Sequence, residues 1–374
     1  MIITGYEALC NLGNNIDEIY KNAIVGNISC FDNLDNYIPE DYIHAGIIKT
    51  QLPQIQEEDF NIRSNQLLLK NIQLLEGKIN SLNYSHDRIG VVVASTNSGV
   101  NEYEFSKNQK HFELGNSAAF LKQYLKLEGF YATVSTACSS GIKAFSLARD
   151  MLKNNVLDAA IIACVDSLSK VPIYGFASLE LLSKNTSVPL SKNRCGMNLG
   201  EASAIFIVEN NNSTGIEVMG IGESSDIYHP TTPDPEAKEV ISAINIAMKD
   251  ANVKPQDIDY INMHGTGTPA NDLMEANAIY KVFGDKVPVS STKPMTGHCL
   301  GAAAGIETAL CCKLLDSFDG RLYPHVYDGA YDNTLPKINL VEKDKKYSKG
   351  KIFMCNSFGF GGTNAIMILG RNNE

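Results

Sequence analysis

The sequence lacks any long apolar stretch. Its longest apolar runs are short, as at residues 159–165, and none approaches the roughly 18 apolar residues that a membrane-spanning helix needs. The first ten residues, MIITGYEALC, contain no Lys or Arg, whereas a secretory signal peptide begins with a basic segment. We therefore expect a soluble, cytoplasmic protein with no membrane span.

Positive charge is scarce as well. The 374 residues include 32 Lys and Arg against 42 Asp and Glu, which gives a formal net charge of −10. Nucleic acids and anionic membranes attract basic surfaces, so this balance argues against both as non-specific partners. A local basic patch for an acidic partner remains compatible with it. A hydrophobic content of 44% is ordinary for a globular protein.

The nine cysteines include no C-x-x-C pair. An odd number without such pairs disfavours both a disulfide framework and a structural zinc site. Most of the cysteines lie in apolar stretches such as residues 309–315, where Cys acts as a small hydrophobic residue. The expected role of a Cys in this chain is therefore packing, unless its context indicates chemistry.

The sequence does contain a regular alternation of strands and helices, which is typical of the α/β class. A polar stretch at residues 209–213 divides the alternation, and we predict one half at residues 1–209 and another at 214–374. The expected strands are 1–9, 88–94, 131–135, 159–165, 202–208, 215–221, 259–263, 287–290, 351–355 and 365–369. The expected helices are 17–25, 139–154, 235–251, 272–283 and 300–316.

The two halves share one local pattern. Each contains a strand, a loop of small residues and an apolar helix, as in VSTACSSGIKAFSLARDML (134–152) and VSSTKPMTGHCLGAAAGIETALCCKLL (289–315). The likeness indicates an internal duplication. It would place Cys138 and His298 at equivalent helix starts.

The segment TACSSG, residues 136–141, surrounds Cys138 with small residues where a strand should end and a helix begin. A thiol at a helix N-terminus is near the positive end of the helix dipole, which favours thiolate. Small neighbours let backbone N–H groups approach, where they could hold an oxyanion. A buried structural Cys in a tight junction would suit the same residues, so this motif alone leaves both interpretations open.

A second motif, HGTGTPAND, covers residues 264–272 directly after the apolar strand DYINM. His264 at the carboxyl end of a strand, before a glycine-rich loop, is well placed to project into a crevice. Thr266 and Thr268 alternate with glycines and offer hydroxyl groups beside an accessible backbone. The alternative is a turn in which His264 donates a hydrogen bond to the backbone.

A third motif places His298 at the entry of an expected helix. The dipole and burial there would lower the pKa of His298 and favour the neutral imidazole. Glu307 lies in a helix that is apolar on most faces, and a buried carboxylate needs a partner, for which Lys293 is the candidate. A purely structural ion pair beside a core His is the alternative. One Cys and two His at loop–helix junctions form a set suited to nucleophilic acyl chemistry.

A fourth motif, NSFGFGGTNA at residues 356–365, is rich in glycine and lies between two expected strands. Glycines allow unusual backbone angles and close approach to a ligand. It is not a P-loop, because no Gly-Lys-Ser/Thr follows.

These motifs, with YGFASLELLS and GEASA between them, occur in an order that resembles the β-ketoacyl-acyl carrier protein synthases of the thiolase superfamily. The resemblance covers nearly the whole chain. It implies an α/β thiolase fold, with two pseudo-symmetric halves in a five-layer αβαβα arrangement. Members are usually homodimers formed along the strand that precedes the nucleophile. A heterodimer with a homologous ketosynthase-like subunit is the other assembly we expect.

The resemblance also implies an activity. Cys138 would take an acyl chain from an acyl carrier protein, and the N–H groups of Cys138 and Phe360 would form its oxyanion hole. His264 and His298 would stabilise the enolate left when malonyl-acyl carrier protein loses carbon dioxide, and Lys293 with Glu307 would order the His pair. The product would be a 3-oxoacyl-acyl carrier protein of fatty acid, aryl polyene or related polyketide synthesis.

The remaining implied roles concern the substrate. Phe360 would gate malonyl entry, and the implied substrate-binding residues are Thr266, Thr268, Phe358 and Asp272. The phosphopantetheine arm belongs to the carrier protein, so neither a separate cofactor nor a metal is implied.

Two departures from the family pattern stand out. The chain is short between about residues 55 and 131, which leaves acyl-length preference open. The loop Pro189–Ala202 shows Ser191 and Cys195 where the family usually carries acids, and we expect a structural adjustment there.

Three alternatives to a self-sufficient condensing enzyme follow. One is the active subunit of a heterodimer with a chain-length factor, and another is a non-catalytic partner subunit, which would usually lack the nucleophile. The third is a thiolase or Cys–His hydrolase, for which Cys355 would be the second catalytic Cys.

Overall fold

The fold is built from two sets of five strands with the same topology. The computed structural model of the protein describes residues 1–210 and 214–371. The first set is β1 (Ile2–Cys10), β4 (Ile89–Ala94), β5 (Tyr131–Val134), β6 (Ala159–Asp166) and β8 (Ala202–Glu209). The second is β9 (Ile216–Ser225), β10 (Tyr260–Asn262), β11 (Pro288–Ser290), β13 (Ile352–Gly359) and β14 (Thr363–Arg371).

The strand order repeats from one set to the other. It runs β5-β4-β6-β8-β1 in the first set and β11-β10-β13-β14-β9 in the second, so in both sets the third strand in sequence lies at one edge and the first at the other. In each set the second strand is parallel to the third and fourth, and the fifth is antiparallel to both its neighbours. The two pseudo-symmetric halves expected from the sequence are therefore present. The boundary predicted at residues 209–213 falls partly on residues 211–213, which lie outside the described residues.

The two sets meet edge to edge. β1 pairs with β9 through Ile2 with Glu217 and Ile3 with Ile216, and the short β12 (Asn339–Leu340) extends β11. A separate small sheet contains β2 (Asp32–Ile38), β3 (Asp41–Gly46) and β7 (Leu199–Gly200).

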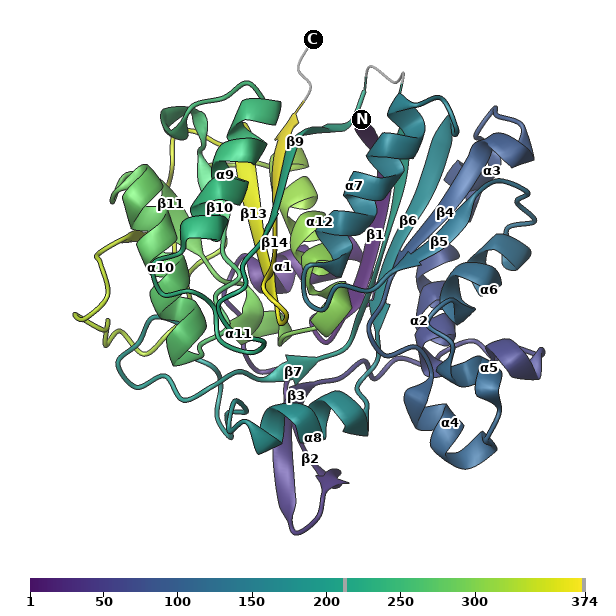
Figure 1. Ribbon diagram of the computed structural model, residues 1–374, viewed down its shortest axis with the longest axis horizontal. Helices are drawn as coiled ribbons and strands as arrows, with labels where there is room; N and C mark the ends of the chain where they lie inside the picture. Colours follow the sequence, from purple (N-terminus) through teal and green to yellow (C-terminus); the bar gives the residue numbers. More distant parts are fainter. Residues whose placement is uncertain (211–213, 372–374) are drawn as a thin grey trace.

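Helices and sheets alternate in five layers (Figure 1). Helices α2 (Arg63–Ile72) and α6 (Asn116–Tyr124) cover the outer face of the first strand set. Helices α7 (Ser140–Lys153) and α12 (Ala303–Asp316) lie between the two sets, and α9 (Lys238–Asp250) and α10 (Pro269–Phe283) cover the outer face of the second. The expected αβαβα arrangement is confirmed.

The central strands read as unbroken apolar runs because they are covered on both faces. Every residue of β4, β6 and β8 is buried. α12 is buried over almost its whole circumference, which explains why its sequence, AAGIETALCC, shows no polar face. The largest apolar cluster joins α7 and α12 to strands of both sets.

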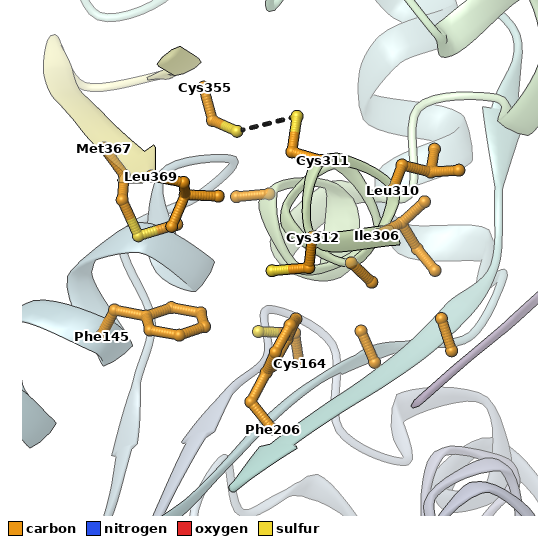
Figure 2. Packing of buried hydrophobic residues seen from close by; sticks show 14 of the residues in the cluster. Phe145, Cys164, Phe206, Ile306, Leu310, Cys311, Cys312, Cys355, Met367 and Leu369 are labelled. Atoms are coloured by element: carbon orange, nitrogen blue, oxygen red, sulfur yellow. Dashed lines mark hydrogen bonds between the residues drawn. The ribbon is translucent and has the colours of Figure 1, made fainter. Parts of the chain in front are cut away.

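Two glycines allow the middle layer to pack closely. A Cβ added to Gly141 in α7 would lie 2.9 Å from Ala304 Cβ, and one added to Gly305 in α12 would lie 2.4 Å from Cys164 Cβ. Figure 2 shows the cysteines of this layer among the other apolar side chains, with Cys311 Sγ 3.4 Å from Cys355 Sγ. All nine cysteines are free thiols, and seven of them are buried, so packing is their common role.

The expected strands and helices are all present, with ends that differ by no more than four residues. The sequence gave no expectation for most of residues 26–130, which form a helical region and part of the small sheet. The helices not yet named are α1 (Ile16–Ala23), α3 (Glu76–Asn80), α4 (Val100–Ser106), α5 (Gln109–Phe112), α8 (Lys170–Ser178) and α11 (Lys293–Thr296). Among the helices of the described residues, none is both long and apolar enough to cross a membrane.

Candidate active site

Cys138 lies in a tight turn between β5 and α7. Ala137 adopts a left-handed backbone conformation with φ of 52°, which turns the chain sharply before the thiol. Ser140 Oγ accepts from Thr136 N–H at 2.8 Å and donates to Ala137 C=O at 2.6 Å. From the other half, Ser357 Oγ donates to the Cys138 carbonyl at 2.7 Å. The turn is thus held by short-range bonds and by a bond that crosses between the halves.

Two backbone donors near the thiol are unused. Within the described residues, the N–H groups of Cys138 and Phe360 donate no hydrogen bond to any other residue. Such donors are available to a developing oxyanion, as the small residues of the sequence motif suggested.

The structure brings His264 and His298 together beside Cys138. Their ring centroids lie 5.3 Å apart with the planes at 89°, and a ring nitrogen of each lies within 4.8 Å of the other and of Cys138 Sγ. His264 follows β10, and His298 precedes the single turn that leads into α12. Cys138 precedes α7 in the same way, so the equivalent helix starts expected from the duplication are present.

Hydrogen bonds to the Nδ1 atoms fix the tautomers of both rings. His298 Nδ1 accepts from Leu300 N–H at 3.1 Å, which leaves the proton of the neutral ring on Nε2. His264 Nδ1 lies 3.3 Å from Lys293 Nζ, an ammonium group that can only donate. Each imidazole therefore offers an Nε2–H donor.

Burial determines the protonation of this group. Burial, together with the Lys293 charge, lowers the pKa of both His264 and His298 well below the usual value, so both rings are neutral. Burial also raises the pKa of Cys138 to about 12, with Lys293 acting in the opposite direction. The helix start was expected to favour thiolate, but loss of solvation outweighs it, and the resting group is a thiol.

Lys293 is paired as the sequence suggested. Its Nζ lies 2.5 Å from Glu307 Oε1, and both side chains are 2% exposed. Burial raises the pKa of Glu307 to about 7, while Lys293 lowers it. The ion pair places a cation beside His264 without leaving it uncompensated in the core.

One residue that sequence reasoning missed holds the His264 loop. Glu275, buried in α10, accepts from His264 N–H at 2.8 Å and from Gly265 N–H at 2.7 Å. Asn356 Nδ2 also donates to Glu275, at 3.0 Å. Glu275 carried the same signal as Glu307, a carboxylate within a buried apolar helix, and could have been found by the same reasoning.

Cys138 and the two His lie at the bottom of a cavity of about 330 Å³. Thr266 and Thr268 line it, with their hydroxyls 2.9 Å apart. Phe358 lies with its ring centroid 5.6 Å from that of His264, and Phe360 lies near the entrance against Phe176. A thiol, two neutral imidazole donors and two free backbone N–H groups therefore face one enclosed space.

Comparison with known proteins places this site in a family. The family model described as Beta-ketoacyl synthase, N-terminal domain, matches residues 2–213, and that described as Beta-ketoacyl synthase, C-terminal domain, matches residues 216–318. The chain belongs to the β-ketoacyl synthase family.

Curated relatives agree. A 3-oxoacyl-[acyl-carrier-protein] synthase 2 of Coxiella burnetii is 38% identical over 262 residues, which cover 66% of this chain and 63% of that protein. A protein of the same name from Staphylococcus aureus is 28% identical over an alignment of 416 positions, which covers 98% of this chain and 97% of that one.

Solved structures agree as well. A structure of a ketosynthase in complex with its chain length factor, from Xenorhabdus doucetiae, matches with a TM-score of 0.93 and 34% identity, covering 99% of this chain and 97% of that one. A β-ketoacyl synthase from Burkholderia phymatum, at 22% identity and a TM-score of 0.87, covers 99% of this chain and 98% of that one and supports the fold.

Asp272 does not join the other predicted site residues of this β-ketoacyl synthase. Its carboxylate is fully buried outside the cavity lining and accepts from Leu190 N–H at 2.7 Å and from Gly267 N–H at 3.2 Å. Its neighbour Asn271 lines the cavity instead. Asp272 therefore shapes the glycine-rich loop from behind, where a polar group must satisfy buried backbone donors.

The loop with Ser191 and Cys195 shows the expected adjustment. Ser191 Oγ donates to Ala330 C=O, and Arg194 binds Asp332 at 2.6 Å, so the segment after α12 supplies partners for the loop. Cys195 is exposed at its outer side.

The thiolase alternative finds no support in the geometry. Cys355 is buried against Cys311 in the middle layer, and it does not line the cavity (Figure 2). The second catalytic Cys that this alternative requires is absent from the described cavity lining.

The donor set also bears on metal binding. Cys138, His264 and His298 have side chains and spacing that could bind a cation. A metal at Nε2 of His298 would have to displace the proton that the Leu300 N–H bond keeps there. The Lys293 ammonium beside His264 would repel the ion. The arrangement favours donation to an oxyanion over ligation of a cation.

Proposed function

We propose that this β-ketoacyl synthase condenses a Cys138-bound acyl chain with malonyl-acyl carrier protein. In the first step the Cys138 sulfur attacks the thioester carbonyl of an acyl carrier protein. The N–H groups of Cys138 and Phe360 hold the oxyanion, the carrier thiolate leaves with the thiol proton, and the acyl chain remains on Cys138.

In the second step malonyl-acyl carrier protein enters the cavity. Its carboxylate leaves as carbon dioxide, and the electron pair of the broken bond forms an enolate. The Nε2–H groups of His264 and His298 donate to the enolate oxygen. The enolate carbon then attacks the acyl carbon, the bond to Cys138 breaks, and the product is a 3-oxoacyl-acyl carrier protein.

The observation that carries this proposal is the pair of fixed tautomers. Leu300 N–H and Lys293 Nζ occupy the Nδ1 atoms, and burial keeps both rings neutral, so two N–H donors face the thiol. Lys293 and Glu307 act as positioning residues for His264. Thr266, Thr268 and Phe358 would contact the phosphopantetheine arm or the acyl group, and Phe360 would gate the entrance.

Intact-protein mass spectrometry tests the proposal. The enzyme is incubated with acyl-acyl carrier protein and then with malonyl-acyl carrier protein. We expect an acyl adduct on Cys138, its loss on addition of malonyl carrier, and a 3-oxoacyl product. Cys138→Ala should show neither adduct nor product, whereas Cys195→Ala, an exposed thiol outside the cavity lining, should behave as wild type. Condensation by Cys138→Ala at the wild-type rate would contradict the assignment.

We further propose that the enzyme is the active subunit of an assembly with a homologous partner. Support comes from its similarity to the structure of a ketosynthase in complex with its chain length factor. Cys138 in an intact site disfavours a non-catalytic role. Native mass measured alone and after co-expression with a ketosynthase-like homologue separates homodimer from heterodimer. A cytoplasmic location remains a prediction.

A further inference from the structure

Exposed apolar side chains gather around the entrance of the cavity. Seventeen large apolar side chains are exposed in residues 1–210 and 214–371, and six of them lie on the segments that form this entrance. We name these six the mouth patch: Val171, Tyr174, Leu179, Ile227, Tyr228 and Phe360. Ile227 is 100% exposed, Val171 59% and Tyr228 58%. Exposed apolar clusters of this kind mark interaction sites more often than isolated residues do.

Three segments bring the patch to one place. Phe176 and Leu179 line the cavity from α8 and the residue after it, and Val171 and Tyr174 are exposed on the same helix. Asp226 and His229 line the cavity on either side of Ile227 and Tyr228. The Phe176 and Phe360 ring centroids lie 5.5 Å apart, which joins α8 to the glycine-rich hairpin.

Charged groups near the patch offer little attraction to an acidic surface. Lys170, at the start of α8, pairs with Glu104 at 3.5 Å, and Lys184 pairs with Asp41. Glu180 next to Leu179 is exposed and acidic. The chain as a whole carries a net charge of −10. The cations on this rim are therefore already neutralised by neighbouring carboxylates.

We propose that the mouth patch is the docking surface of the acyl carrier protein and that its contacts are apolar rather than ionic. The inference rests on the proposed function, since a carrier-borne thioester must pass this entrance to reach Cys138. The carrier body then lies against the rim, where Ile227 and Tyr228 meet it. The partner is a carrier protein with apolar side chains around the attachment point of its phosphopantetheine arm.

Substitution outside the cavity lining tests the surface. Ile227→Ser and Tyr228→Ser, alone and combined, are compared with Ile246→Ser, an exposed Ile on the outer helix α9. The measurements are KM for a hexanoyl-loaded acyl carrier protein and the acylation rate with hexanoyl-pantetheine, which has no protein body. We expect the double variant to raise KM for the carrier at least tenfold. Ile246→Ser should leave KM unchanged, and all variants should react with hexanoyl-pantetheine at the wild-type rate.

Salt distinguishes apolar from ionic docking. Between 50 and 500 mM NaCl we expect KM for the carrier to change less than threefold, because apolar contacts are not screened. A rise of tenfold or more, equal losses with both substrates, or a double variant that matches Ile246→Ser would overturn the proposal. A shift in native mass on substitution would instead assign the patch to a second copy of this chain.

A binding measurement keeps this test separate from the proposed function. Fluorescence anisotropy of a labelled hexanoyl-acyl carrier protein reports docking without chemistry. If wild type binds the carrier and the double variant does not, while no acyl adduct forms on Cys138, the reaction is wrong and the surface stands. If an adduct forms but binding is unaffected by the double substitution, the surface is wrong and the reaction stands.

Discussion

The two halves share one topology and place different chemistry at corresponding loops. After its third strand, the N-terminal half turns within a few residues into α7 and presents Cys138. After its third strand, the C-terminal half inserts the short helix α11, which contributes Lys293, before it presents His298 at the start leading to α12. A duplicated scaffold has thus supplied a nucleophile from one copy and proton donors from the other.

The loops after the second strands differ in the same way. In the N-terminal half, Asp166 at the end of β6 accepts from Thr96 N–H at 2.9 Å and from Asn97 N–H at 3.0 Å. In the C-terminal half, Glu275 of α10 holds His264 and Gly265. Each half clamps its loop with a buried carboxylate, but only the C-terminal loop presents an imidazole. The comparison predicts that acylation depends on one half and decarboxylation on the other.

The sharpest test of this division is His298→Ala. Loss of one of the two Nε2–H donors should slow decarboxylation and condensation by about 10²- to 10³-fold, as for removal of an oxyanion-hole donor. Acylation of Cys138 should fall much less, because its proposed oxyanion donors are backbone N–H groups. Carbon dioxide release and adduct formation are measured separately. Equal loss of both steps would mean that the halves do not divide the chemistry.

Glu275→Gln is expected to have the next largest effect. The amide can accept one backbone N–H, but its Nε2–H₂ would face the other, so the His264 loop loses a hydrogen bond and gains a donor–donor contact. A buried unsatisfied donor costs about 1–3 kcal/mol. We expect condensation to fall about tenfold or more, with the acylation rate retained.

The control for that variant comes from the same clamp. Asn356→Asp, which changes a second partner of Glu275, should lower the condensation rate as well. If Glu275→Gln lowers only the thermal stability and leaves kcat unchanged, its role is structural.

Much of this site followed from sequence because its residues sit at junctions set by local pattern. Cys138, His264 and His298 lie where strands give way to loops and helices, and the strand–helix alternation located those points. Lys293 and Glu307 were paired by the cost of burying a lone charge. Glu275 was missed, although the same cost applies to it.

Other features depend on contacts that sequence pattern does not encode. Asp272 was expected to contact substrate, but its side chain is directed at the backbone of Leu190, 82 residues earlier. Ser357 bonds the Cys138 carbonyl across 219 residues. The rise in the pKa of Cys138 comes from burial by both halves, which outweighs the local helix effect. The entrance helix α8 and the small sheet likewise depend on tertiary packing.

A smaller effect compares the glycines of the two middle helices. An added Cβ in Gly305→Ala would meet Cys164 Cβ on the rigid strand β6, whereas in Gly141→Ala it would meet Ala304 on the neighbouring helix. Overpacking a core costs about 1–3 kcal/mol. We expect Gly305→Ala to lower the free energy of unfolding more than Gly141→Ala in urea titrations. The reverse order would show that α7, and not α12, is the fixed element of the middle layer.

The smallest effect concerns the pH dependence of the N-terminal clamp. Burial raises the pKa of Asp166 to about 6, above its ordinary value of 3.8, so the folded protein binds this proton more tightly than the unfolded chain. The resulting stability is fully present below about pH 4 and is lost as the pH rises through 6. Asp166→Asn lacks this titration. The free energy of unfolding of wild type relative to the variant should therefore fall by about 1 kcal/mol or more between pH 4 and 7.

Other buried groups leave this difference intact. Asp272 and Glu307 have pKa values raised to about 7 and lose stability in the same direction, while the lowered pKa values of His264 and His298 act oppositely. All four are present in both proteins, so they cancel in the comparison. Asp166 also accepts from Gly301 N–H at 2.7 Å, three residues after His298. Parallel stability curves for the two proteins would mean that these bonds keep Asp166 ionised in the folded state, and that the N-terminal clamp holds the start of α12 as a charge.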